Sequence, residues 1–312
     1  MRGLILAAGL GERIRPLSEL RPKPALPVRG LPVIGFGLRL LARHGVHEVV
    51  INRHHLAGPL EQAAESARPE QTTLRWSDEP ELLGTGGALR RVASFLAESD
   101  PSLLLAGDML LDADLSKLID LHTARGDAVT FLLKEDRRAP LFGTIGVDSD
   151  GRVRRVGRHF DLGGEMRAGI YAHATVISAE VLSTLPDRAA FNHLTDWIVP
   201  RLAEGADDVR GEVLGEGECT WEPVGTPAEY LAANLEFPAL SYVDASELAR
   251  ETGTRWEAGV VLGAGATLGA GAHLERAVVW DGEAVPAGFQ GRDGVFAGGR
   301  FHACAPAAGG AG

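Results

Sequence analysis

Residues 4–28 read LILAAGLGERIRPLSELRPKPALPV and begin with a short apolar run that ends in glycine. Such a run predicts a buried parallel strand over Leu4–Ala8. The glycines of Gly9-Leu10-Gly11 let backbone N–H groups approach a phosphate without interference from a Cβ atom. Arg13 and Lys23 then supply two cations, which suit a triphosphate and its leaving pyrophosphate. The segment therefore predicts a loop that binds a polyphosphate.

Two widespread phosphate-binding motifs do not fit this loop. The fingerprint of dinucleotide-binding proteins requires a third glycine where Ile14 stands, and no acidic residue follows the expected strand about 20 residues later. The P-loop is excluded because no Gly-Lys-Ser or Gly-Lys-Thr follows the glycines. The loop therefore argues against an enzyme that transfers hydride.

Strands and helices alternate downstream of the loop. The predicted strands are Leu4–Ala8, Glu48–Asn52, Thr73–Trp76, Ser102–Ala106, Ala128–Leu133 and Ala168–Ala174, and Gly143–Val147 with Arg152–Val156 form a predicted hairpin. The predicted helices are Ile34–His44, Leu60–Ala67, Ala88–Ala97 and Leu115–Arg125. This alternation predicts an α/β fold, a Rossmann-like and mostly parallel sheet with helices on both faces. Ligands bind beyond the carboxyl ends of strands in such sheets, which is where Gly9–Arg13 and Asp108 stand.

Small or branched residues recur every six positions near the end of the chain. The first row is Val260, Ala266, Ala272, Val278 and Ala284, and the second row is Leu262, Leu268, Leu274, Trp280 and Pro286. A hexapeptide period is typical of a parallel β-helix, in which each hexad forms one side of a coil. Five hexads make fewer than two triangular coils, so we expect this segment to cap the first domain or to stack against another subunit.

The expected domain organisation follows from these patterns. Residues 1–238 form a first domain, 239–257 a linker and 258–304 a short β-helix. The final segment 305–312, APAAGGAG, offers almost nothing to bury and is predicted to be disordered.

Composition and charge narrow the class of protein. The 312 residues carry 31 basic and 42 acidic side chains, a net charge of −11, which disfavours a general nucleic-acid binder. Residues 1–60 nevertheless hold nine basic side chains against three acidic ones, which favours a local anion site. Cys219 and Cys304 form no CxxC pair, so we expect a reduced, cytoplasmic setting. The opening apolar run is too short for a membrane span and leads into charged residues, so no membrane or secretory segment is expected there.

The first motif resembles the signature LAAGxGxRxxPLT…PKPxxPV of the sugar-1-phosphate nucleotidylyltransferases, also called NDP-sugar pyrophosphorylases. The resemblance continues through Glu81–Leu89, Leu105–Asp108, Ala168–Tyr171 and the segment from Gly225 to Asn234. With the hexapeptide tail it covers nearly the whole chain. The chain is most similar to the mannose-1-phosphate guanylyltransferase-like group, which carries a C-terminal left-handed β-helix.

The resemblance implies a role for each matching residue. It implies that Arg13 and Lys23 are the catalytic residues. The residues expected to bind the nucleotide are Ala7, Ala8, Gly9, Gly11, Glu81, Gly84, Thr85, Gly86 and Gly87. The residues expected to bind the sugar phosphate are Gly143, Arg158, Arg167 and Gly169. The resemblance also implies the cofactor Mg²⁺ with Asp108 as a ligand, since this hard cation takes one or two carboxylates together with substrate phosphates, and Glu222 is the candidate for a second ligand.

Two positions depart from the family's pattern. Family members usually carry an aspartate before the hydrophobic-Gly-Thr element, where it completes the metal site, whereas Pro223 stands there in this chain. Glu222 is adjacent and is the expected second ligand, although a shift of one residue in a strand turns a side chain to the opposite face. The family's Glu-Lys-Pro element has no clear counterpart, and either Arg158 or Arg167 replaces its lysine.

The implied reaction joins a nucleoside triphosphate to a sugar 1-phosphate and releases pyrophosphate. GTP and mannose 1-phosphate are the expected pair, with Gly84–Gly87 as a backbone-lined cleft for the base and Glu79 or Glu81 accepting hydrogen bonds from guanine. Two alternatives stay open: a uridylyltransferase for an amino-sugar 1-phosphate, of the N-acetylmuramate-1-phosphate type, and a catalytically weak regulatory homologue that binds nucleotide sugars. We expect no nucleic-acid or membrane partner, and a homo-oligomer formed through the C-terminal β-helix.

Overall fold

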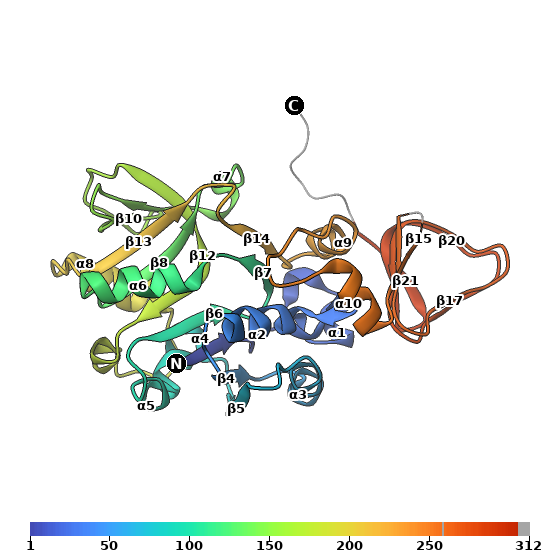
Figure 1. Ribbon diagram of the computed structural model, residues 1–312, viewed down its shortest axis with the longest axis horizontal. Coiled ribbons are helices and arrows are strands. Elements are labelled where there is room, and N and C mark those ends of the chain that lie inside the picture. Colours follow the sequence, from blue (N-terminus) through green and yellow to red (C-terminus); the bar gives the residue numbers. More distant parts are fainter. Residues whose placement is uncertain (258, 305–312) are drawn as a thin grey trace.

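A ten-stranded mixed sheet forms the centre of the protein, whose computed structural model describes residues 1–257 and 259–304. Its strands are β1 (Arg2–Leu6), β4 (Glu48–Arg53), β5 (Thr73–Asp78), β6 (Ser102–Ala106), β8 (Val129–Lys134), β9 (Ile145–Val147), β10 (Val153–Val156), β11 (Phe160–Asp161), β12 (Arg167–Ile177) and β13 (Val209–Leu214). The order along the sheet is β11-β10-β9-β12-β6-β1-β4-β5, and β8 pairs with both β12 and β13. Strands β6, β1, β4 and β5 pair in parallel, whereas β12 runs antiparallel to β6, β8 and β9. The predicted α/β fold is confirmed, and an antiparallel extension continues it (Figure 1).

Helices cover both faces of this sheet, as the sequence predicts. One face carries α2 (Val33–Arg43), α3 (Ala57–Ser66) and α6 (Leu115–Arg125), and the other carries α4 (Gly84–Arg91), α5 (Ala93–Leu96) and α8 (Val199–Ala203). The neighbouring residues Leu4 and Ile5 of β1 belong to the two different cores, because side chains alternate between the faces of a strand.

The single helix predicted over Ala88–Ala97 is wrong. Helical geometry begins at Gly84 and stops after Arg91, because Val92 adopts φ −110° and ψ 9° before α5 starts. Val92 is β-branched, which disfavours the helix, and its side chain is buried in the core on that face.

The remaining short elements lie around the sheet and lead to the C-terminal strands. They are α1 (Leu17–Leu20), β2 (Pro27–Val28), β3 (Leu31–Pro32), β7 (Met109–Asp112), α7 (Ala139–Phe142), β14 (Thr220–Pro223), α9 (Pro227–Leu235) and α10 (Ala245–Thr252). Helix α10 lies within the segment expected to be a linker, and its Leu248 is buried. Among the residues that the structure describes, no helix is both long enough and apolar enough to cross a membrane.

The C-terminal strands stack in parallel at one end of the molecule (Figure 1). Strands β16 (Val260–Leu262), β18 (His273–Val279) and β20 (Gln290–Ala297) form one layer, and β17 (Thr267–Leu268) pairs with β19 (Ala284–Val285) in another. Strands β15 (Arg255–Glu257) and β21 (Arg300–Ala303) close the first layer in antiparallel fashion. Ala258 and the predicted tail 305–312 lie outside the described residues.

The six-residue spacing of the predicted rows does not carry through a full coil, because paired strands are offset by one residue from three complete hexads. Three full hexads would pair Val260 with Val278, but Val260 pairs with Ala277. The shift of one residue turns Val278 away from the interior, where Val260 and Val279 pack. Val278 instead packs towards the first domain together with Trp280.

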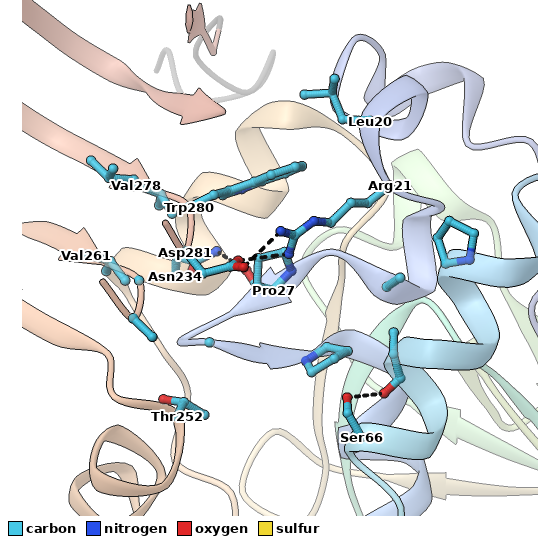
Figure 2. Close-up of a pocket in the computed structure, with 18 of the residues that line it drawn as sticks. Leu20, Arg21, Pro27, Ser66, Asn234, Thr252, Val261, Val278, Trp280 and Asp281 are labelled. Atoms are coloured by element: carbon cyan, nitrogen blue, oxygen red, sulfur yellow. Dashed lines mark hydrogen bonds and ion pairs between the residues drawn. The ribbon is translucent and has the colours of Figure 1, made fainter. Parts of the chain in front are cut away.

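The junction with the first domain is both apolar and ionic. The column Val261, Val278 and Val295 packs in one core with Tyr230 of α9, whose hydroxyl accepts a 2.9 Å hydrogen bond from Trp280 Nε1. Arg21 lies over the Trp280 ring, 4.7 Å from its centroid, and pairs with Asp281 at 2.9 Å (Figure 2). The short C-terminal segment therefore caps the first domain, the first of the two arrangements that the sequence allowed.

Candidate active site

A cleft of about 610 Å³ opens at the carboxyl end of β1 and brings the first motif together with Asp108. Its lining includes six residues for which the sequence predicts a role: Ala7, Gly9, Gly11, Arg13, Lys23 and Asp108. Gly9 and Gly11 have different structural roles in the loop. A Cβ atom on Gly9 would meet nothing within 4 Å, so the backbone there is open to a ligand. Gly11 has φ +64° and lies against Ser18, whose hydroxyl donates to the Gly11 carbonyl at 2.8 Å.

A buried polar brace behind the loop holds its start in place. The Ala7 N–H donates to Asn52 Oδ1 at 2.6 Å, and Asn52 Nδ2 donates to Glu79 Oε1 at 2.8 Å. The other carboxylate oxygen of Glu79 accepts the Leu83 N–H at 3.1 Å. Glu79 is only 4% exposed and both its oxygens are engaged within the protein, so its role here is structural. The sequence analysis missed Asn52, whose only signal is its place at the carboxyl end of the EVVIN strand.

Two cations converge on one glycine at the floor of the cleft. A Cβ atom on Gly225 would lie 3.3 Å from Arg13 Nη2 and 3.6 Å from Lys23 Nζ. Lys23 Nζ also donates to Asp108 Oδ2 at 2.6 Å. Burial alone would raise the pKa of the Asp108 carboxyl, but the Lys23 ammonium outweighs that effect and holds the pKa below its usual range. Arg13, Lys23 and Asp108 therefore form one charged cluster beside the open backbone of Gly9.

The second glycine-rich segment is packed rather than open. The N–H groups of Gly86 and Gly87 donate to the Phe191 carbonyl at 2.9 and 3.3 Å. A Cβ atom on Gly86 would clash with the Phe191 ring, and Gly84 has φ +69°. Glycines are needed here so that the Phe191 segment can approach. Base recognition by Gly84–Gly87 stays a prediction, as it does for the exposed Glu81 and the buried Ala8, which does not line the cleft.

The four residues predicted for the sugar phosphate lie outside the lining of this cleft. Arg167 is half exposed and pairs with Glu135 at 2.8 Å, and Arg158 is exposed in the turn between β10 and β11. Gly169 is required by packing, since a Cβ atom there would lie 2.9 Å from the backbone of Lys134. Gly143 has φ +75° and ends α7. None of the four lines the cleft with Asp108, so their contact with the sugar phosphate stays a prediction.

A cluster of rings that the sequence analysis missed stands at β12. His173 has φ +54°, where the pairing of β12 with β8 shifts register between Tyr171 and Thr175. Its ring lies 4.5 Å from the Tyr171 ring, and the Tyr171 hydroxyl bonds Thr175 and, at 3.3 Å, His193 Nε2. Burial lowers the pKa of His193 to about 3, so it is neutral. Desolvation by the surrounding protein also lowers the pKa of His173, although the negative charge of Asp108 acts to raise it.

The fit of a Mg²⁺ ion differs between the two predicted ligands. The Asp108 carboxylate is 39% exposed and faces the cleft, so it suits one corner of a shell completed by phosphates and water. Glu222 is held by Arg138 at 2.8 Å and is not brought to Asp108, and Pro223 in β14 lies opposite Met109 without a side-chain oxygen. The prediction of Glu222 as a ligand is therefore not supported. Within 1–257 and 259–304, no group of three metal-binding side chains is gathered.

Comparisons with known proteins agree with this arrangement. The profile of the Nucleotidyl transferase family matches residues 2–239. The chain is 28% identical over 220 residues to a UTP–glucose-1-phosphate uridylyltransferase of Synechocystis, a match that covers 65% of this chain and 55% of the relative. It is 27% identical over 299 residues to a mannose-1-phosphate guanylyltransferase of Mycobacterium tuberculosis, covering 91% of this chain and 81% of the relative.

A solved structure supports the fold. The crystal structure of HddC from Yersinia pseudotuberculosis complexed with GMP-PN superimposes with a TM-score of 0.62 at 21% identity, covering 76% of this chain and 99% of that chain. The family match spans the sheet, the glycine loop, Asp108 and Gly225, which together form the cleft. The chain therefore belongs to the nucleotidyl transferase family.

Proposed function

We propose that the protein transfers a nucleotidyl group from a nucleoside triphosphate to a sugar 1-phosphate, giving an NDP-sugar and pyrophosphate. The convergence of Arg13 and Lys23 beside the open backbone of Gly9 carries this proposal. Two cations next to free backbone N–H groups suit the high negative charge of a triphosphate. GTP and mannose 1-phosphate are the favoured pair, since the relative aligned over 91% of the chain is a mannose-1-phosphate guanylyltransferase.

The reaction is a single in-line displacement at the α-phosphorus. A phosphate oxygen of the sugar phosphate forms the new bond, the bond to the β-phosphate oxygen breaks, and pyrophosphate leaves with that electron pair. Arg13 and Lys23 neutralise charge on the leaving pyrophosphate, and the loop N–H groups orient the triphosphate. A Mg²⁺ ion held by Asp108 would supply further charge neutralisation on the phosphates.

A second candidate is a uridylyltransferase for an amino-sugar 1-phosphate. One observation favours it: both oxygens of Glu79 are engaged by Asn52 and Leu83, so this carboxylate is not free to read guanine. The regulatory homologue is the third candidate, and it is favoured by Pro223 beside Asp108, where a second carboxylate is expected.

We also propose that the stacked C-terminal strands form a left-handed hexapeptide β-helix through which the protein forms a homo-oligomer. The regular parallel pairing of β16, β18 and β20 supports the coil. Light scattering of the full chain tests the oligomer: a mass above 33.0 kDa supports it, and a monomer at all concentrations contradicts it.

Pyrophosphate release tests the catalytic proposal. The purified protein is incubated with Mg²⁺, each of GTP, UTP, dTTP and ATP, and each of mannose 1-phosphate, glucose 1-phosphate and N-acetylmuramate 1-phosphate. Release with one pair supports the proposal, and the best pair identifies the base and sugar. Arg13→Ala is expected to lose most of this activity, whereas Arg15→Ala is the matched control because Arg15 is exposed and faces Glu19. Nucleotide-sugar binding without release by any pair would favour the regulatory homologue.

A further inference from the structure

His173 is held in an unusual backbone conformation within the long strand β12. Its φ of +54° is left-handed, a conformation that costs free energy for a residue with a Cβ atom. The register of β12 against β8 shifts around it, and the bulge turns the His173 side chain out to solvent between the buried residues Ala172 and Ala174. Bulges of this kind re-aim a side chain beside active sites.

The strand pairing places His173 on the side of Asp108 that faces away from the glycine loop. Ala174 pairs with Leu105 of β6, so His173 ends that ladder next to the turn that carries Asp108. On its other edge β6 pairs with β1, the strand that leads into the glycine loop. His173 and Gly9 therefore flank Asp108 from opposite sides.

The ring of His173 is supported from behind by a chain of side chains. It rests on the Tyr171 ring, with the two planes inclined by 34°. The Tyr171 hydroxyl reaches His193 Nε2, and His193 Nδ1 lies 2.7 Å from Thr85 Oγ1. Tyr171 and His193 are positioning residues, because they are buried behind the exposed His173 ring and fix it from that side.

The direction of the proposed displacement connects this ring with the acceptor. Pyrophosphate leaves towards Arg13 and Lys23, so the attacking sugar phosphate must arrive from the other side of the α-phosphorus. That side is the β12 side, where His173 stands. We propose that His173 contacts the sugar of the sugar 1-phosphate and is a specificity-determining residue; this inference rests on the proposed function. An imidazole ring offers hydrogen-bonding nitrogens that suit a sugar hydroxyl.

Binding of nucleotides with and without the sugar tests the proposal directly, without a need for turnover. Isothermal titration measures GDP-mannose against GDP, and UDP-N-acetylglucosamine against UDP, for the wild type and for His173→Ala. Loss of one hydrogen bond to the sugar is expected to weaken the nucleotide-sugar by about tenfold, with the plain nucleotide unchanged. The KM for the sugar 1-phosphate rises by a similar factor, whereas the KM for the nucleoside triphosphate stays the same.

Two further variants separate contact from backbone strain. His173→Asn accepts the left-handed conformation and keeps a polar side chain, so it is expected to restore part of the affinity. His173→Gly relieves the strain but lacks the side chain, so it is expected to bind the nucleotide-sugar as weakly as His173→Ala while unfolding at a higher temperature.

Each other outcome overturns the inference. An equal loss for nucleotide and nucleotide-sugar makes His173 structural, and unchanged affinity for both removes it from the site. If pyrophosphate release occurs normally in the wild type and the His173 variants show either result, the proposed function stands and only this inference fails. If the wild type neither binds a nucleotide-sugar nor releases pyrophosphate, both fail.

Discussion

The two glycine-rich segments of the first domain look alike in sequence and differ in what their glycines permit. In Gly9-Leu10-Gly11 a Cβ atom on the first glycine would meet nothing, so the missing side chain leaves room for a ligand. In Gly84–Gly87 the space is filled by the Phe191 segment, whose carbonyl accepts two of the glycine N–H groups. The first segment is open for chemistry and the second is closed by packing. Glycine content alone does not separate the two cases.

The basic side chains of residues 1–60 also differ in what they do despite their similar chemistry. Four of the nine are arginines that form ion pairs with distant parts of the chain: Arg2 pairs with Glu98, Arg21 with Asp281, Arg39 with Glu251 and Arg53 with Asp78. Arg13 and Lys23 are the two that line the cleft. The excess of positive charge therefore indicates an anion site only through these two residues.

Removal of a cation from the open segment is expected to have the largest effect. Lys23→Ala should lower kcat about 10²- to 10³-fold, by analogy with loss of one preorganised donor in a transition state. The melting temperature should change little, because the Asp108 side chain is 39% exposed at the cleft and keeps access to solvent when its partner is removed. Steady-state kinetics and thermal unfolding of the same preparation check this, and a variant that is fully active would exclude Lys23 from catalysis.

A methyl group in the packed segment should act on stability instead. A Cβ atom on Gly87 would clash with the Ala189 carbonyl and lie 2.8 Å from Leu83 Cβ, so Gly87→Ala is expected to lower the free energy of unfolding by about 3 kcal/mol. Gly9→Ala is the matched control and should change that free energy by less than about 0.5 kcal/mol. Urea unfolding curves measure both. Equal losses of stability in the two variants would show that the two segments do not differ in packing.

The brace behind the open loop should have a smaller effect. Asn52→Ala leaves the Ala7 N–H and Glu79 without a buried partner, and we expect a loss of about 2 kcal/mol in the free energy of unfolding. Nucleotide affinity should fall as well, since the loop loses its anchor. Chemical unfolding and GTP titration check the two parts, and a variant with wild-type values in both would show that the brace is dispensable.

At neutral pH the smallest effect comes from His193 beside the packed segment, whose influence on stability grows only as the pH falls. His193 bonds Thr85, and burial lowers its pKa to about 3 from a usual value of about 6.5. The unfolded chain therefore binds a proton more readily than the folded protein, so stability is full above about pH 6.5 and falls as the pH decreases towards 3, by at most about 1.4 kcal/mol per pH unit. His193→Gln should flatten this slope. Unfolding curves between pH 4 and 7 test it, and an unchanged slope would assign it to other groups.

The sequence predicts the elements that local pattern determines. Alternating apolar runs and helical periods located β1, β4, β6 and α6 closely. The first motif located Arg13 and Lys23, and the end of the Ser102–Ala106 strand located Asp108. The shifted coil was missed because pairing across a full turn depends on turn lengths, which the hexapeptide rows do not contain. Asn52 and His173 were missed, and Glu79 was predicted to bind the base rather than to brace the loop, for a related reason. Their roles arise from hydrogen bonds and a bulge between segments far apart in the chain, and no local period reports them.

The open glycine loop with Arg13 and Lys23 is expected to hold the triphosphate. A crystal structure of the protein with a non-hydrolysable GTP analogue tests it most directly. We expect triphosphate density between the backbone of Gly9 to Gly11 and the side chains of Arg13 and Lys23, with Gly86 and Gly87 still bonded to Phe191. Triphosphate density only in the cavity of about 530 Å³ beside Trp280 (Figure 2), or no density in the cleft at saturating analogue, would contradict it.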